Sequence, residues 1–364
     1  MEHKVYIQDI SKENIQNVID NALDSSSLSF SGKKVLIKPN ILGPFPSEKG
    51  VTTHPMVISA IVDGLIKRGA IIIVGDNPGS LYAKIEQIGK ITGLGPASKG
   101  YLRSISDSEW IHLEKINENI PISKAVLDAD IIINVPRFKT HGLTGITCAI
   151  KNMFGIIPGG KKAYLHTVAP NRKEFASLLV DVYKIRPPDF TIVDGTTAME
   201  GVGPSHGNLR PLNKLIWGTD PIAIDSVVSQ MMGIPPDLID TTVLGHRAGL
   251  GEIDPKKIGV NGSFLIIPNF RFPSRIATLI PEKFSKFFNF GTLKPKLIRK
   301  KCIKCGNCKE VCPKEAIVLN PYPQIARDRC ISCYSCIEHC PVGALTLPTV
   351  FEDIIKELRY RLFR

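Results

Sequence analysis

Eight of the nine cysteines repeat one spacing near the C-terminal end of the 364-residue chain. Each copy reads C-x2-C-x2-C-x3-C-P, in which three thiolates bind one [4Fe-4S] cluster and the fourth, before the proline, reaches the other cluster. The spacing therefore predicts two clusters. One would be held by Cys302, Cys305, Cys308 and Cys340, and the other by Cys330, Cys333, Cys336 and Cys312.

Other uses of these cysteines are disfavoured. An x2, x2, x3 run places too many thiolates together for one tetrahedral zinc ion. Disulfides are not expected either, because residues 1–10 lack a basic region followed by an apolar stretch and a cleavage site, which points to a reducing cytoplasm. We therefore expect a cytoplasmic iron–sulfur protein suited to anaerobic conditions.

The cysteine-rich segment is also an internal repeat. Residues 315–319 align with residues 343–347, so each half holds a cluster loop, a short helix and a strand. This segment resembles the bacterial-type ferredoxins, which implies a small α+β two-cluster domain over residues 301–348.

The rest of the chain is long enough to bury a large core of its own, with 43% apolar residues overall. No apolar run approaches the roughly 18 residues of a membrane helix, so no transmembrane segment is expected. No nucleic-acid-binding module is recognisable, so nucleic acid is not an expected partner.

The net charge of +12 is concentrated in a predicted linker, residues 271–300, which is also rich in phenylalanine. The pattern suits a basic amphipathic helix. Two interpretations stay open: the linker docks on a membrane face or an acidic redox partner, or its phenylalanines pack on the large domain. Apolar residues at helical spacing predict a further helix over residues 349–364.

Residues 1–270 alternate strand and helix patterns. Residues 34–38 and 70–74 read as strands, and residues 56–67 between them read as a helix, which gives a right-handed crossover joining parallel strands. Further strands are expected at 131–135, 191–193 and 215–217, with helices near 174–184 and 222–232. The predicted class is α/β, with a parallel sheet flanked by helices.

Ligands of such sheets bind beyond the carboxyl ends of the strands, where this chain places polar residues. Several cations beside the backbone amides of Gly159 and Gly160 suit an anionic ligand, a carboxylate or a phosphate. The expected ligand-binding residues are Lys38, Asn40, Asp76, Lys139, Lys151, Asn152 and His166. Asp220 and Pro221 read instead as a helix cap, and Cys148 reads as a buried small side chain.

Many short motifs resemble the domain-of-unknown-function 362 family over roughly residues 33–262. They are Lys38-Pro-Asn, Thr53-x-Pro55, Asp130-Ile-Ile-Ile-Asn-Val-Pro136, Lys139-Thr-His141, Lys151-Asn-x-x-Gly155, Asp194-Gly195, Gly201-x-Gly-Pro204 and Gly218-x-Asp-Pro-x-Ala-x-Asp225. That family commonly carries a fused ferredoxin module. The resemblance implies an iron–sulfur protein of unassigned reaction.

A weaker resemblance is to the lactate racemase-like enzymes that use a nickel-pincer nucleotide. The order His141, Lys151, His166 is similar to the segment in which those enzymes hold their cofactor by a lysine and a histidine, which implies a nickel-bearing cofactor. The chain departs from the pattern at residues 75–78, where Gly-Asp-Asn-Pro replaces an expected Gly-x-His-Arg.

Fusion of a two-cluster module to a ligand-binding domain suggests electron delivery. We expect a ferredoxin-dependent oxidoreductase, served by a redox partner protein, that passes low-potential electrons to an anionic small molecule or cofactor. His141 is the expected general acid, because imidazole titrates near neutral pH. The alternative is an electron carrier or a metallocofactor assembly or handling factor without turnover. A pocket close to a cluster would separate the two.

Overall fold

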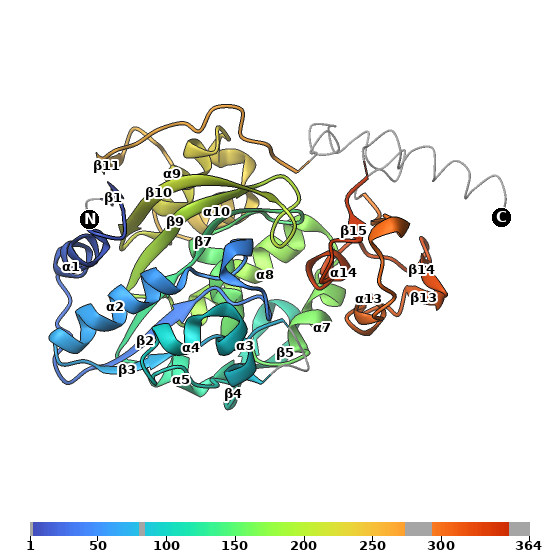
Figure 1. Cartoon of the computed structure of the whole chain (residues 1–364), viewed down its shortest axis with the longest axis horizontal. Helices are drawn as coiled ribbons and strands as arrows, with labels where there is room; N and C mark the ends of the chain where they lie inside the picture. The colour runs from blue at the N-terminus through green and yellow to red at the C-terminus, as the bar shows by residue number, and fades with distance from the viewer. Residues whose placement is uncertain (1–2, 80–83, 274–292, 349–364) are drawn as a thin grey trace.

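The computed structural model describes residues 3–79, 84–273 and 293–348. Figure 1 shows a large domain built on one sheet, with the small cysteine-rich module, drawn in orange and red, at one end of it. Most of the predicted basic linker and the predicted C-terminal helix, residues 349–364, lie outside the described residues. Within the described residues, no helix is both long enough and apolar enough to cross a membrane.

The large sheet has nine strands, in the order β11-β1-β10-β9-β6-β2-β3, with β7 and β8 attached through β9. Their bounds are β1 His3–Asp9, β2 Lys34–Pro39, β3 Ile71–Val74, β6 Ile131–Val135, β7 Arg137–His141, β8 Gly145–Thr147, β9 Phe190–Glu200, β10 Asn208–Gly218 and β11 Ile258–Gly262. A separate hairpin joins β4 Ser108–Leu113 to β5 Glu118–Ser123.

Helices cover both faces of this sheet, which confirms the predicted α/β class. They are α1 Ile15–Ser25, α2 Pro55–Lys67, α3 Ile85–Thr92, α4 Leu94–Ala97, α5 Lys124–Leu127, α6 Ala149–Asn152, α7 Lys161–Val168, α8 Arg172–Ile185, α9 Pro221–Met231 and α10 Asp240–Arg247. Strand β6 is buried along its whole length, as a central parallel strand covered on both faces must be.

Two helix starts show how local sequence sets these elements. Helix α2 begins at Pro55, and the ring of His54 accepts a hydrogen bond from the backbone N–H of Met56. Helix α9 begins at Pro221, and Asp220 accepts hydrogen bonds from two backbone N–H groups of the first turn. The predicted cap at Asp220 is confirmed, because a carboxylate there satisfies donors that have no partner within the helix.

The sheet is mixed rather than purely parallel. Strands β2, β3, β6 and β9 pair in parallel, as predicted for the crossover units. Strands β9 and β10 are instead a long antiparallel ribbon of 11 residues each, and β10 is antiparallel to β1 as well. The sequence predicted only the sheet-embedded parts of these two strands, because their outer halves lack a continuous apolar run.

The segment after β6 corrects one expectation. Its polar residues are expected beyond the end of the strand at 131–135, but Arg137 to His141 form a strand of their own, β7, which pairs with both β8 and β9. All five side chains are buried. Asp194 likewise lies inside β9 rather than beyond its end. These polar residues are therefore held by a ladder of backbone hydrogen bonds instead of a mobile turn.

A buried ion pair fixes the start of β7. Arg137 Nη1 lies 2.6 Å from Asp194 Oδ2, and the two side chains are 2% and 0% exposed. Asp194 also accepts the backbone N–H of His54 at 2.6 Å. Although burial alone would raise it, the pKa of Asp194 is lowered, because the charge of Arg137 and the backbone hydrogen bonds favour the carboxylate.

The module contains two short α-helices and two small two-stranded antiparallel sheets. Its elements are β12 Lys296–Leu297, α13 Asn307–Glu310, β13 Ile317–Asn320, β14 Tyr322–Ile325, α14 Ser335–Glu338 and β15 Leu345–Thr346. Strand β12 pairs with β15, so the last residues of the predicted linker form one edge of the module. The predicted repeat appears as helix α13 followed by β13 and helix α14 followed by β15.

The Arg137 to Asp194 pair gives a test of the fold. Replacing Arg137 by Met should lower the free energy of unfolding by about 3–5 kcal/mol, because it leaves a buried carboxylate unpaired. The exposed pair of Lys67 with Asp20 supplies the control, and Lys67→Met should cost less than about 1 kcal/mol. Anaerobic urea unfolding followed by circular dichroism measures both.

The sign of the pH dependence follows from the lowered pKa of Asp194. The pair stabilises the fold above the ordinary titration range of the carboxyl, near pH 4, and the stabilisation is lost as pH falls through the lowered value. If the Arg137 and Lys67 variants lost the same free energy of unfolding, the buried ion pair would not be what stabilises the start of β7.

Candidate functional site

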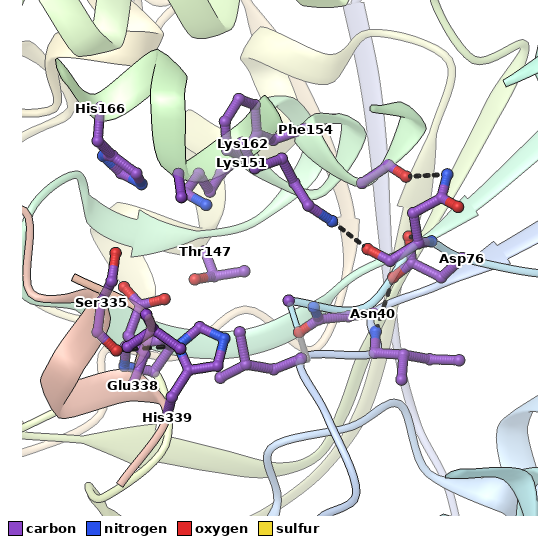
Figure 2. A pocket seen from close by; sticks show the side chains of 18 of the residues that line it. Asn40, Asp76, Thr147, Lys151, Phe154, Lys162, His166, Ser335, Glu338 and His339 are labelled. Carbon is purple, nitrogen blue, oxygen red and sulfur yellow. Dashed lines mark hydrogen bonds between the residues drawn. The ribbon is translucent and has the colours of Figure 1, made fainter. Parts of the chain in front are cut away.

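A cavity of about 160 Å³ lies between the large domain and the module. Figure 2 shows the side chains of the large domain along most of its wall and those of Ser335, Glu338 and His339, from α14, on another side. The polar side chains around it are Asn40, Asp76, Asn77, Lys139, His141, Thr147, Lys151, Asn152, Lys162, His166, Glu310, Cys312, Ser335, Glu338 and His339.

The carboxyl edge of the sheet brings the large-domain groups together. Strands β2 and β3 are parallel neighbours, so Asn40 and Asp76, which follow them, meet at the same edge. Strand β7 adds Lys139 and His141, which are two residues apart and therefore lie on one face of the strand. The chain from α6 to α7 supplies Lys151, Asn152, Lys162 and His166.

Lys38 is the one predicted binding residue that does not line the cavity. Its Nζ is fully buried and lies 2.7 Å from Asp76 Oδ1. A Cβ atom on Gly155 would lie 2.1 Å from the same carboxylate oxygen, so only glycine leaves room for the pair. Lys38 thus neutralises and positions Asp76 behind the cavity wall, and its role in ligand binding stays a prediction.

Two lysines give the cavity its positive charge. Lys151 Nζ lies 5.1 Å from the centre of the Phe154 ring and forms no ion pair within the described residues. Lys162 Nζ donates hydrogen bonds to the backbone carbonyls of Asn77 and Pro78. Burial lowers the pKa of both amines, that of Lys162 to about 8, so Lys162 is charged at neutral pH.

Lys139 contributes less charge. Its Nζ donates a hydrogen bond of 2.8 Å to the carbonyl of Val51, and burial, together with Arg137, holds its pKa well below the usual range. The cavity therefore offers Lys151 and Lys162 as its main cations; Asp76 is already paired with Lys38, and the carboxylate of Glu338 lies against His141 and attracts Lys151. Such a balance favours an anionic ligand.

Several buried polar atoms on the wall have no hydrogen-bond partner among the described residues. They are Asn40 Oδ1, Thr147 Oγ1, His166 Nδ1 and His339 Nε2. Buried polar groups are normally satisfied in folded proteins, so a group of them around one cavity marks a place where a ligand completes the bonding. An amide oxygen can only accept, which calls for a hydroxyl or amine on the ligand near Asn40.

The ring of His166 is held in place by aromatic neighbours. It stacks on Phe175 with ring centres 4.2 Å apart, and Phe154 meets it edge-on. Burial lowers the pKa of His166 to about 3, so the ring is neutral at physiological pH. A neutral, fixed imidazole can accept or donate one hydrogen bond to a ligand but is a poor source of a proton.

Both ring nitrogens of His141 are already engaged. Nδ1 accepts hydrogen bonds from the backbone N–H groups of Leu143 and Thr144, so the ring proton sits on Nε2. Nε2 lies 3.2 Å from Glu338 Oε1 in the module, and the two side chains are 3% and 12% exposed. Burial lowers the pKa of His141, which favours this neutral tautomer.

The module places its eight cysteines around two small cavities of about 20 Å³ each. The first is lined by Cys302, Cys305, Cys308 and Cys340, and the second by Cys312, Cys330, Cys333 and Cys336. These are the two predicted ligand sets, including the exchange of the fourth cysteine. Four thiols around a space of this kind fit a [4Fe-4S] cluster. Cys312 and Pro313 also line the large cavity.

The sequence did not identify the module's share of the cavity. Glu338 and His339 stand between two predicted cluster ligands; Glu338 repeats Glu310 of the first half, and only His339 differs in character from its counterpart, Val311. His339 fits against Gly79, where a Cβ atom would lie 2.7 Å from its Nε2. Such contacts depend on how the two domains dock, which a spacing pattern does not describe.

One further motif belongs to a different class of site. Gly203-Pro204-Ser205-His206-Gly207 matches the Gly-x-Ser-x-Gly pattern of α/β-hydrolases. Here it joins two antiparallel strands, β9 and β10, whereas the hydrolase nucleophile stands between a strand and a helix. The serine is buried beside the module and does not line the cavity. The match therefore does not indicate a hydrolase.

Both parts of the chain match a known protein family or domain. The family described as domain of unknown function (DUF362) matches residues 35–230, and the 4Fe-4S dicluster domain matches residues 301–344. A thylakoid-associated protein of Synechocystis is 32% identical over 228 residues, which are 60% of this chain and 69% of that protein. The predicted ferredoxin-like module is confirmed as an iron–sulfur domain.

Two solved structures are more distantly similar. A Thermotoga maritima protein is 14% identical, with a TM-score of 0.35, over 56% of this chain and 54% of its own. The lactate racemase apoprotein of Thermoanaerobacterium thermosaccharolyticum is 11% identical, with a TM-score of 0.39, over 61% of this chain and 55% of its own. This chain spans a little over half the length of either structure.

The lowered pKa of Lys162 can be measured directly. Competitive labelling with acetic anhydride, read by mass spectrometry between pH 6 and 10, should give Lys162 a half-maximal reactivity near pH 8, because only the neutral amine reacts. An ordinary lysine titrates near pH 10.4. If Lys162 followed the profile of the exposed lysines, the desolvated cation described here would be absent.

Proposed function

This chain belongs to the DUF362 family and carries a 4Fe-4S dicluster domain, and we propose that it is an oxidoreductase that delivers low-potential electrons to an anionic small molecule or cofactor held between its two domains. One observation carries the proposal: Cys312 lines both the second cysteine cavity and the large cavity. A ligand in the large cavity would lie against the wall of a redox centre. A carrier without turnover has no need of such a pocket.

The cysteine quartets would hold two [4Fe-4S] clusters, one in each small cavity. Such clusters supply single-electron transfer, at potentials that hydrogen bonding and exposure set between roughly −700 and +450 mV. The residues of the chain then have three tasks: to bind the ligand, to keep it beside Cys312, and to balance charge as it is reduced.

Binding of the anionic end would fall to Lys151 and Lys162. Helix α7 starts directly after Gly159 and Gly160, both on the cavity wall, and no side chain caps its first turn, where backbone N–H groups can receive an anion. Gly159 has a φ of +64°, which a glycine adopts without strain. The unpartnered oxygens of Asn40 and Thr147 would receive hydroxyl or amine groups of the same ligand.

Lys151 and Lys162 would also balance the negative charge that the ligand gains when it is reduced. Each added electron leaves one more negative charge on the ligand, and a fixed cation in a buried site offsets it without reorganisation. Lys162 is also the better proton donor, because its pKa of about 8 keeps it charged yet acidic enough near neutral pH. We therefore assign proton donation to Lys162 and revise the general-acid hypothesis for His141, whose ring bonds instead hold Glu338 of α14 in place.

A resident cofactor is the second candidate occupant. Lys151 and His166 lie on one wall of the cavity, and a lysine with a neutral imidazole could hold an organic or nickel-bearing group as well as a substrate. In that case the chain would handle or reduce a metallocofactor. The cytoplasmic location predicted from the sequence stays a proposal, since the Synechocystis relative is described as thylakoid-associated.

Anaerobic purification tests the proposal. The native protein should carry about eight irons per chain, and mass spectrometry of the released small molecules should show a bound anion. Lys151→Ala with Lys162→Ala should lose that anion while keeping its iron. Lys161→Ala is the matched control, because Lys161 pairs with Glu118 at 2.9 Å and does not line the cavity.

The outcomes separate the alternatives. Nickel in proportion to the bound molecule would favour the resident cofactor, and a metal-free anion would favour a substrate. Eight irons with no anion in the native protein, and no anion bound after incubation with inorganic phosphate or small carboxylates, would contradict the oxidoreductase. Equal loss in the Lys161 variant would show that the anion binds outside this cavity.

A further inference from the structure

The two cysteine quartets face different surroundings. The second quartet shares Cys312 with the large cavity. The first quartet faces outward, because Cys305 is exposed and two residues that line the same small cavity, Ile303 and Val342, are 61% and 38% exposed. One side of the module therefore reaches the ligand, and the other reaches the surface of the protein.

The outward side is strongly basic. Between residues 293 and 348 there are ten Lys and Arg residues and four Asp and Glu residues. We call the group Arg299, Lys300, Lys301, Ile303, Lys304 and Val342 the basic face. Within the described part of the chain, none of its four cations forms an ion pair with a carboxylate; Arg299 and Lys304 lie over the ring of Tyr322 instead.

Transient protein interfaces commonly have a few apolar residues surrounded by side chains that all carry the same sign of charge. Apolar contact provides the buried centre, and the rim raises the association rate with a partner of opposite charge. Unpaired surface cations also repel one another, so they contribute more when a partner neutralises them than in the free protein. Lys304 lines the same small cavity as the exposed Cys305, and Arg299, Lys300 and Lys301 directly precede the predicted cluster ligand Cys302, which points to a partner that exchanges electrons.

We propose that the basic face docks an acidic one-electron carrier protein, which reduces the module beside Cys305. The inference rests on the proposed function, since it requires redox centres at both quartets. The carrier is oxidised by one electron and the module is reduced by one, with no bond made and no proton moved. A lipid surface would account for the charge of this face but not for the exposed cluster cysteine beside Lys304.

Charge reversal tests the docking site. Lys301→Glu with Lys304→Glu should weaken binding of an acidic flavodoxin, used as the probe, by at least about tenfold at 50 mM salt, with little difference from the native protein at 500 mM salt. Lys33→Glu with Lys34→Glu makes the same change in net charge at exposed residues of the large domain and is the control. Binding is measured anaerobically by titration of the oxidised proteins.

The rate of electron transfer gives a second test of the docking site. Reduction of the Lys301 and Lys304 variant by reduced flavodoxin, followed by loss of visible absorbance, should slow by a similar factor. Reduction by the small methyl viologen radical should not slow. The iron content of each variant is counted first, so that a protein lacking about eight irons counts against the proposed function and not against the docking site.

Three results would overturn the inference while irons are in place. The native protein could fail to bind flavodoxin, the two double variants could lose affinity equally, or the Lys301 and Lys304 variant could bind it unchanged. In the last case, loss of sedimentation with phosphatidylglycerol vesicles in that variant alone would assign the basic face to a membrane.

Discussion

The contact between His141 and Glu338 ties the two domains together at the cavity. His141 belongs to a strand of the large sheet, and two backbone N–H groups fix its tautomer so that Nε2 carries the proton. Glu338, which lies between two predicted cluster ligands, accepts a hydrogen bond from this N–H at 3.2 Å. Without this contact, and the fit of His339 against Gly79, the module would lose its register with the sheet edge.

The docking of the module on the large domain determines which chemistry the cavity can support. Large-domain groups at the sheet edge could bind an anion by themselves, and the module could carry electrons by itself. Only their contact places Cys312 on the wall that Lys151 and Lys162 also line. Buried cations are costly unless they are compensated, and here the compensation for Lys38 comes from Asp76, while Lys151 forms no direct ion pair among the described residues and is attracted only at longer range by Glu338 and Asp76. We infer that a ligand supplies the missing negative charge.

Short stretches of the sequence predicted those features that a short stretch determines by itself. Cysteine spacing gave both quartets, and the apolar run at residues 131–135 gave a central strand. Lys38 looked like a binding residue because it ends a strand, but which side of the sheet edge its side chain occupies depends on Gly155 and Asp76, far away in sequence.

Strand β7 shows a different limit. Lys139 and His141 alternate with Phe138 and Thr140, which fits a strand, but so short an alternation does not distinguish a new strand from polar residues at the end of the previous one. The long partner strand β9 decides the matter, because it extends past the sheet edge and pairs with β7. The module's residues at the cavity depend on tertiary docking alone, for which neither composition nor spacing carries a signal.

The most direct measurement is an iron anomalous difference map from anaerobically grown crystals of the native protein. We expect two groups of iron, one of them ligated by Cys312 together with Cys330, Cys333 and Cys336, and density for a bound anion in the adjoining cavity within reach of Lys151 and Lys162. A second iron group that lies away from this cavity, with Cys312 outside its ligand set, would contradict this expectation.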